Sequence, residues 1–196
     1  MGTDRLDEVL DAAYYCLTRY GVRRTTMDDI ATAMGVSRSA VYQYVRSKDD
    51  AFRRLAGRLH EQALRRAREA AASDAPYPDR LHGVLAAKLG LVLQLAGDSP
   101  HAAELIDEKT RLFGDICTSF TADLRSLLTG LFTEAGTVAG VGPARAADIC
   151  IALVVGLESA PDPRGLLPPA TDALATGLLG TDARPDDSPH PPHSTP

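Results

Sequence analysis

The segment 25–48, TTMDDIATAMGVSRSAVYQYVRSK, predicts two short helices that cross at a glycine turn. Thr26 is expected to N-cap the first helix, with Asp29 three residues further on at the spacing of a capping box. Gly35 follows the last apolar position of that helix, where a left-handed turn costs glycine little. Ser37 is expected to N-cap the second helix. The pattern is that of a helix-turn-helix.

The second of these helices has two chemically different sides. Ala40, Val41 and Tyr44 form its apolar side. The other side carries groups that hydrogen-bond bases or phosphates, as a helix in the DNA major groove does. These residues are Arg38, Ser39, Tyr42 and Gln43. Two ordinary packed helices are the alternative, but Ala31, Gly35 and Val41 at the spacing of a tight crossing favour DNA binding.

The distribution of charge agrees with a DNA-facing N-terminal part. The net charge of −5 argues against indiscriminate nucleic-acid binding. Residues 1–68 nevertheless hold 13 Lys and Arg against 9 Asp and Glu, a net +4, whereas the remainder holds 8 against 17, a net −9. A basic part joined to an acidic part suits one domain that faces DNA and one that faces solvent.

Further residues between about Leu6 and about Leu59 surround the motif, after an amphipathic first helix. They are Tyr20-Gly21, Thr26, Ile30-Ala31, Gly35-Val36-Ser37, Val41-Tyr42 and Ser47-Lys48. With them, this region resembles the tetracycline-repressor (TetR) family of transcriptional regulators. Family members usually carry Phe at the position of Val45 and an aliphatic residue near Phe52, so the pair is either a compensating exchange or drift. The remaining chain matches the family only in length and helical character.

The resemblance implies an all-α fold with an N-terminal three-helix DNA-binding domain. A long helix joins it to a C-terminal helical domain for ligand binding and dimerisation. We expect the first domain at 1–48, its connector helix at 48–72, and the second domain at 73–180. Helical periodicity predicts about nine helices, the first ending at Gly21. In the C-terminal domain they are expected at 79–96, 101–108, 109–134, 143–159 and 168–179. The tail, 181–196, is expected to be disordered because it consists largely of Asp, Ser, Pro and His.

The residues expected to touch DNA divide into base-reading and phosphate-binding groups. Arg38 suits guanine and Gln43 suits adenine, each through two hydrogen bonds. Tyr44 either reads bases or packs under the first helix. Lys48 lies in the first turn of the connector helix, where free amides also attract phosphate. The complete predicted set is Thr26, Ser37, Arg38, Ser39, Tyr42, Gln43, Tyr44 and Lys48.

Useful DNA specificity requires two such motifs, because one touches only a few base pairs. A symmetric homodimer would meet a palindromic operator on double-stranded DNA, with half-sites about 34 Å apart or a multiple of it. The expected dimer surface lies on the last two helices. It consists of Ile149, Leu153, Gly156, Leu157, Leu174 and Leu178. The alternative is that the nearly apolar helix 143–159 forms only the buried centre of the domain.

The resemblance also implies a ligand cavity whose filling changes the spacing of the two DNA-binding domains. The expected effector is a small, partly apolar molecule of unknown identity, and repression is the family's usual mode. The candidate lining residues are Leu85, Leu89, Arg111, Asp115 and Phe120. The alternative for the polar residues of 109–134 is that they face solvent or the preceding helix.

Other functions find little support in the sequence. His101 and Glu104 share a helical face, but a metal site needs a further ligand, and no catalytic motif is present. We therefore expect no enzyme, no metal and no cofactor. A helical adaptor that binds protein without reading DNA is the alternative function.

The remaining sequence features bear on where in the cell the protein is found. Cys16, Cys117 and Cys150 are expected to be reduced core thiols, with a redox sensor as the alternative. The apolar run 149–157 is far shorter than the roughly 20 residues that span a membrane. The N-terminus is charged and has no apolar signal region. A cytoplasmic protein without membrane contact is expected.

Overall fold

The computed structural model describes residues 2–97 and 101–179, and every element in these ranges is a helix. The helices are α1 (Gly2–Arg24), α2 (Met27–Met34), α3 (Arg38–Val41), α4 (Lys48–Ala71), α5 (Tyr77–Gly97), α6 (Ala102–Ala135), α7 (Pro143–Leu157) and α8 (Pro163–Leu178). An isolated antiparallel bridge joins Thr137 to Leu179. The predicted all-α fold is confirmed. The predicted disordered tail, 181–196, lies outside the described residues.

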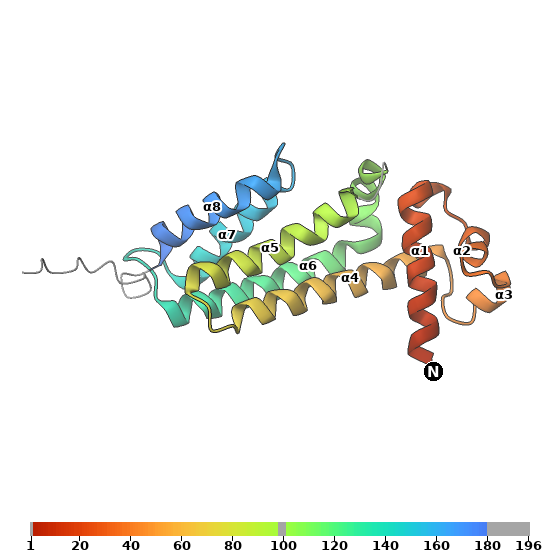
Figure 1. Cartoon of the computed structure of the whole chain (residues 1–196), viewed down its shortest axis with the longest axis horizontal. Coiled ribbons are helices and arrows are strands. Elements are labelled where there is room, and N and C mark those ends of the chain that lie inside the picture. Colours follow the sequence, from red (N-terminus) through yellow and green to blue (C-terminus); the bar gives the residue numbers. More distant parts are fainter. Residues whose placement is uncertain (1, 98–100, 180–196) are drawn as a thin grey trace, which may run out of the picture.

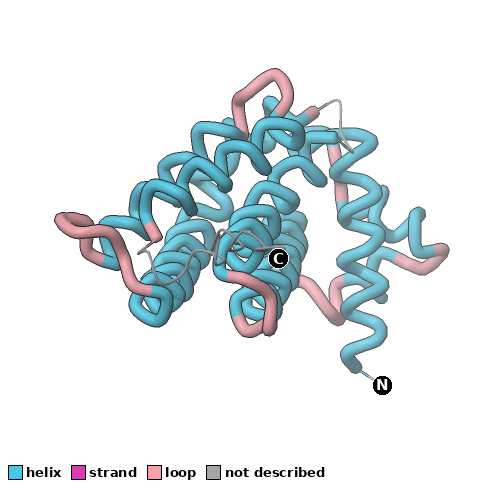
Figure 2. Tube along the Cα trace, turned by 60° about the vertical axis from the view of Figure 1, so that its left-hand side comes forward, coloured by secondary structure: helices cyan, strands magenta, loops and turns pink. Residues whose placement is uncertain are grey.

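The helices form two groups along the long axis of the molecule (Figure 1). Helices α1, α2 and α3 gather at one end, and α4 leads away from them. Helices α5 and α6 run beside α4, and α7 and α8 lie further along the same bundle (Figures 1 and 2). None of the helices in the described ranges is long and apolar enough to cross a membrane. The arrangement makes α4 the element that joins the two groups.

Local signals set the boundaries of the N-terminal helices as predicted. The Thr26 side chain accepts from the Asp29 amide, and the Asp29 carboxylate accepts from the Thr26 amide, which completes a capping box. Gly35 is left-handed, with φ 67°, and ends α2. Ser37 and Ser47 cap α3 and α4.

Gly21 interrupts α1, as expected from its position. Its φ of 79° and ψ of 170° are non-helical, and the chain resumes a short helical turn after it. Thr25 is buried there and donates its hydroxyl to the Gly21 carbonyl, 2.7 Å away, and to the Cys16 carbonyl, 3.1 Å away. Through these bonds Thr25 ties the end of α1 to the part of the helix before Gly21.

Two helix boundaries in the C-terminal part differ from the prediction. The expected separate helices 101–108 and 109–134 form one helix, α6, so eight helices occupy the described ranges instead of about nine. No Gly or Pro lies near the expected break at 108–109, so nothing stops the backbone hydrogen bonds from continuing. Helix α8 begins at Pro163 and not at 168. Asp162 accepts from the Gly165 amide, and Pro163 takes the first position, where its missing N–H is not needed.

Helix α4 contributes apolar residues to the core along its whole length. Its buried face recurs at helical spacing and consists of Ala51, Phe52, Leu55, Leu59, Ala63, Leu64, Ala67 and Ala71. Near its middle, Arg58 donates to Asp11 at 2.6 Å and to Asp7 at 3.3 Å, which ties α4 to α1. The N-terminal helices are therefore packed on, and ion-paired to, the helix that enters the C-terminal bundle.

Candidate nucleic-acid interface and internal cavity

The chain segment after the glycine turn has a buried side and an exposed side. Val41 is fully buried and Tyr44 half-buried, so this side packs on the domain. Helix α3 itself is a single turn, and the chain continues as turns through Tyr44. The predicted DNA-contacting residues on the other side are exposed. They are Ser37, Arg38, Ser39, Tyr42 and Gln43.

Arg38 is held by two neighbouring side chains. It donates to the Tyr42 hydroxyl at 3.0 Å and to the Asp28 carboxylate at 3.1 Å, and its guanidinium lies 5.5 Å from the centre of the Tyr42 ring. The Tyr42 hydrogen bond and the Asp28 charge both raise the pKa of Arg38. Because the Arg38–Asp28 pair is exposed, a base or phosphate can replace the carboxylate at small cost.

Lys48 has a structural contact that the sequence did not suggest. Its Nζ donates to the carbonyls of Val22, at 2.9 Å, and Arg23, at 3.3 Å. The ammonium thus secures the end of α1 against the start of α4. An ammonium has three donors, so one remains for another acceptor. Thr26, the predicted contact at the start of α2, is exposed and holds Asp29 through the capping box.

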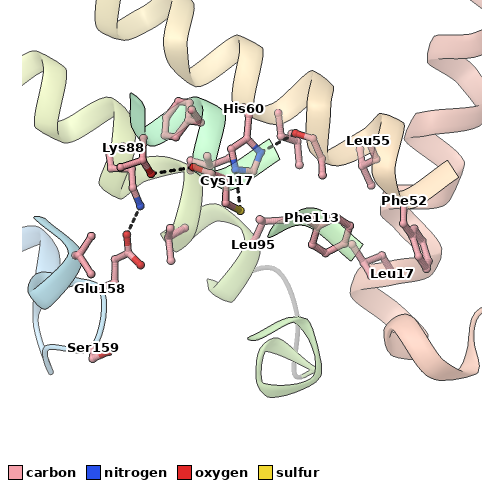
Figure 3. Close-up of a pocket in the computed structure, with 17 residues that line it drawn as sticks. Leu17, Phe52, Leu55, His60, Lys88, Leu95, Phe113, Cys117, Glu158 and Ser159 are labelled. Atoms are coloured by element: carbon pink, nitrogen blue, oxygen red, sulfur yellow. Dashed lines mark hydrogen bonds and ion pairs between the residues drawn. The ribbon is translucent and has the colours of Figure 1, made fainter. Parts of the chain in front are cut away.

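A cavity of about 360 Å³ lies among α1, α4, α5, α6 and the end of α7 (Figure 3). Its wall is mainly apolar and includes Leu17, Phe52, Leu55, Leu59, Leu91, Leu95, Phe113 and Phe120. This volume is within the range of sites for small organic molecules. A partly apolar molecule of modest size fits such a wall.

Of the five predicted lining residues, only Phe120 lines this cavity. Leu85 and Leu89 are each 1% exposed and belong to the packed core. Arg111 pairs with Asp49 at 3.0 Å, and Asp115 pairs with Arg53 on the outer surface. The helical period explains the difference: positions 113, 117, 120 and 121 of α6 face the cavity, whereas 111 and 115 face the start of α4.

Arg53 of α4 forms hydrogen bonds with two residues of α6. Its guanidinium donates to both Asp115 carboxylate oxygens, at 2.6 and 2.9 Å, and to the Leu112 carbonyl at 2.6 Å. The hydrogen bond from Arg53 lowers the pKa of Asp115 to about 2. The start of α4 is therefore attached to the middle of α6 by charge-assisted hydrogen bonds.

Two polar pairs interrupt the apolar wall of the cavity (Figure 3). Lys88, from α5, is 8% exposed and forms an ion pair with Glu158 at the end of α7. Cys117 Sγ lies 3.6 Å from His60 Nε2. His60 and Lys88 were absent from the predicted site. Lys88 could have been recognised from the sequence, because it lies within the apolar helical stretch 84–95, where a charge needs a buried partner.

The predicted dimer residues differ in exposure. Ile149 is 37% exposed and Gly156 is also exposed, whereas Leu153 and Leu174 are half-buried. Leu157 and Leu178 lie in the core of the single chain, 8% and 7% exposed. Two further apolar residues not in the prediction are exposed on these helices, Val155 of α7 and Leu166 of α8.

The three cysteines are thiols in different surroundings. Cys16 and Cys150 are completely buried, and burial raises their pKa values to about 11 and about 12. Cys117 is half-buried on the cavity wall. In the part of the chain with described side chains, no three His, Cys, Asp or Glu residues gather as a metal site would require.

The N-terminal region matches a known family of proteins. Residues 9–55 match the model described as bacterial regulatory proteins, tetR family. YhgD of Bacillus subtilis, described as an uncharacterized HTH-type transcriptional regulator, is 29% identical over 89 residues, which cover 45% of this chain and 47% of YhgD. TtgR, an HTH-type transcriptional regulator of Pseudomonas putida, is 28% identical over 110 residues, 56% of this chain and 52% of TtgR. The chain thus matches about half the length of these relatives, both described as transcriptional regulators.

The whole fold is shared with solved structures. SmeT, the repressor of the Stenotrophomonas maltophilia multidrug efflux pump SmeDEF, superposes with a TM-score of 0.67 at 19% identity, over 96% of this chain and 97% of SmeT. A complex of SmeT with triclosan gives a TM-score of 0.69 at 18% identity, over 97% and 100% of the chains. At this identity the likeness establishes the fold, and the arrangement of α1–α8 is therefore a known one.

Proposed function

We propose that the protein regulates transcription by binding DNA sequence-specifically through the helix-turn-helix within residues 9–55, the region that matches the tetR family. In this proposal it acts as a homodimer on a palindromic operator and represses until a small molecule releases it. The observation that carries the proposal is the exposed group Arg38, Ser39 and Gln43 on a segment anchored by buried Val41. Such a segment presents hydrogen-bonding side chains at fixed positions to the major groove.

The proposed dimer uses the outer face of α7 and α8. Ile149, Ala152 and Gly156 are exposed at helical spacing on α7, and Leu166 is 43% exposed on α8. Small residues such as Ala152 and Gly156 allow a partner helix to approach closely. Leu157 and Leu178 support this face from inside the protomer. Such pairing would hold two DNA-binding domains at a fixed distance, as a palindrome requires.

The proposed release mechanism uses the contact between α4 and α6. Phe113 and Phe120 of α6 line the cavity, and on the same helix Leu112 and Asp115 hold Arg53 of α4. A ligand that prefers a shifted α6 would therefore shift the start of α4 and the domain packed on it. Ligands change such an equilibrium only by binding the two arrangements with different affinity. SmeT in complex with triclosan offers an example of a protein of this fold with a bound organic molecule.

Selection of bound duplexes from a random library tests the proposal. The purified full chain at moderate salt is expected to enrich a palindrome. The Gln43→Ala variant should lose preference at one position of each half-site, while Gln94→Ala, an exposed amide change on α5, should select the wild-type sequence. Absence of enrichment by a folded dimer would overturn DNA readout and favour the helical adaptor.

A further inference from the structure

We propose that Cys117 captures apolar organic electrophiles covalently inside the cavity, with His60 as its base. The chemical class is that of α,β-unsaturated carbonyl compounds, quinones included. The inference rests on the proposed function only in treating the cavity as the effector site. The capture reaction itself depends on the local geometry of two side chains.

The backbone fixes which His60 nitrogen can act as a base. His60 Nδ1 lies 2.7 Å from the Ala56 carbonyl oxygen. A carbonyl only accepts, so Nδ1 carries the hydrogen, and the neutral ring has its lone pair on Nε2. That nitrogen is 3.6 Å from Cys117 Sγ, and the thiol therefore donates its proton toward it.

The imidazole is also held in orientation by its surroundings. The Phe120 ring packs against it edge-to-face, with centroids 5.1 Å apart and an interplanar angle of 87°. Phe120 itself is only 4% exposed. A nucleophile in contact with a base, and a base oriented by a third group, is the arrangement by which proteins activate thiols. Ala56, His60 and Cys117 form such a relay.

The other two cysteines are not accessible from the cavity. Cys16 and Cys150 are 0% exposed, and burial raises their pKa values to about 11 and about 12. A thiol that keeps its proton in an apolar core reacts slowly. Neither residue lines the cavity, so neither can resolve an oxidised Cys117 by forming a disulfide there. These facts favour addition of an organic electrophile over a dithiol redox cycle.

The cavity wall selects the kind of electrophile. Most of its surface is apolar, and Lys88 and Glu158 neutralise each other at one end. Transfer of a charged or strongly hydrated reagent to this wall is unfavourable. An uncharged, partly aromatic molecule gains free energy from the same transfer. The wall thus concentrates apolar electrophiles next to the thiol.

The reaction balances without an oxidant or a leaving group. The Cys117 proton moves to His60 Nε2, and the sulfur forms a bond to the β-carbon of the unsaturated carbonyl compound. The electron pair of the carbon–carbon double bond shifts to give an enolate. The imidazolium then returns the proton to the α-carbon, which leaves a thioether and restores neutral His60.

Site-resolved mass spectrometry of the folded full chain tests this inference. With equimolar N-phenylmaleimide, an uncharged aromatic acceptor, we expect one adduct, located on Cys117, while Cys16 and Cys150 react only after denaturation in urea. Cys117→Ser should abolish the adduct in the folded protein. Labelling of Cys16 or Cys150 as fast as Cys117 would contradict the assignment.

A second variant distinguishes activation of the thiol by His60 from simple accessibility of the thiol. His60→Asn, checked by circular dichroism, should slow adduct formation near neutral pH at least about tenfold. Its rate should rise with pH as for an ordinary thiol, whereas the wild-type profile should be flatter between about pH 6 and 9. An equally fast His60→Asn variant with the wild-type profile would overturn the role of His60. The labelling assay contains no DNA, so a negative result there would not contradict the proposed regulation of transcription. A negative result in duplex selection would likewise not contradict capture of electrophiles by Cys117.

Discussion

Replacement of Gly35 by alanine isolates the cost of the left-handed turn in the helix-turn-helix. Gly35 has φ +67°, and a Cβ built there meets no atom within 4 Å. Steric clash with neighbours therefore contributes nothing, and only the backbone conformation resists the methyl group. That resistance amounts to about 1–2 kcal/mol for a non-glycine residue. Gly35→Ala should destabilise the protein by this amount, and Gly35→Val by more because its branched Cβ crowds the backbone.

Gly57 provides the matched control, since the chemical change is the same. It lies inside α4 with helical geometry, and a Cβ there also meets nothing within 4 Å. Gly57→Ala should stabilise the helix by about 0.5–1 kcal/mol, because alanine has less conformational freedom to lose. The two identical substitutions are thus expected to have opposite signs.

Urea unfolding followed by circular dichroism measures both changes, at one protein concentration because dimerisation would add to stability. All three proteins should unfold with similar slopes. The urea concentration at the midpoint should be highest for Gly57→Ala, intermediate for wild type and lowest for Gly35→Ala. If Gly35→Ala were neutral, or if both variants shifted the midpoint in the same direction, the reasoning about the turn would be refuted.

Three further changes have defined outcomes. Gln43→Ala should cost about 1–3 kcal/mol of operator binding in a fluorescence titration, and an equal loss on scrambled DNA would disprove base reading. Thr26→Ala should lower stability to urea by about 1 kcal/mol through the capping box, with Thr26→Ser close to wild type; equal losses in both would argue against the cap. The Asp115 pKa lies at about 2, below its ordinary 3.8, so pairing with Arg53 stabilises the fold above about pH 4 and is lost toward pH 2. Urea unfolding should therefore show the advantage of wild type over Asp115→Asn shrinking across that range, and a constant difference would contradict the pairing.

The features that the sequence predicted best depend on neighbouring residues. Thr26, Ser37 and Ser47 cap helices through amides three residues away, and Gly35 ends α2 through its own φ. Each such signal is complete within one turn of chain. The same locality explains why the all-α fold and the N-terminal boundaries were predictable before any tertiary contact was known.

The cavity was not predictable in this way, because its wall depends on how helices are rotated against one another. Leu85 and Leu91 are both buried leucines of α5, yet only Leu91 lines the cavity. His60 lies on α4 and was not among the predicted lining residues. Its position is fixed only when α4 packs against α6. Lys48 likewise reaches Val22 across 26 residues of sequence.

The cavity wall and the contact to α4 share one short stretch of α6, and this affects how a cavity occupant could act on the N-terminal helices. Residues 112–121 form an uninterrupted part of this helix. Cys117 and Phe120 face the cavity, and Asp115, less than one turn from Cys117, holds Arg53 on the start of α4. A displacement of α6 by a ligand therefore cannot be absorbed between the cavity and the Arg53 contact. It must either stretch that contact or move α4, and the charge-assisted bonds from Arg53 favour movement of α4.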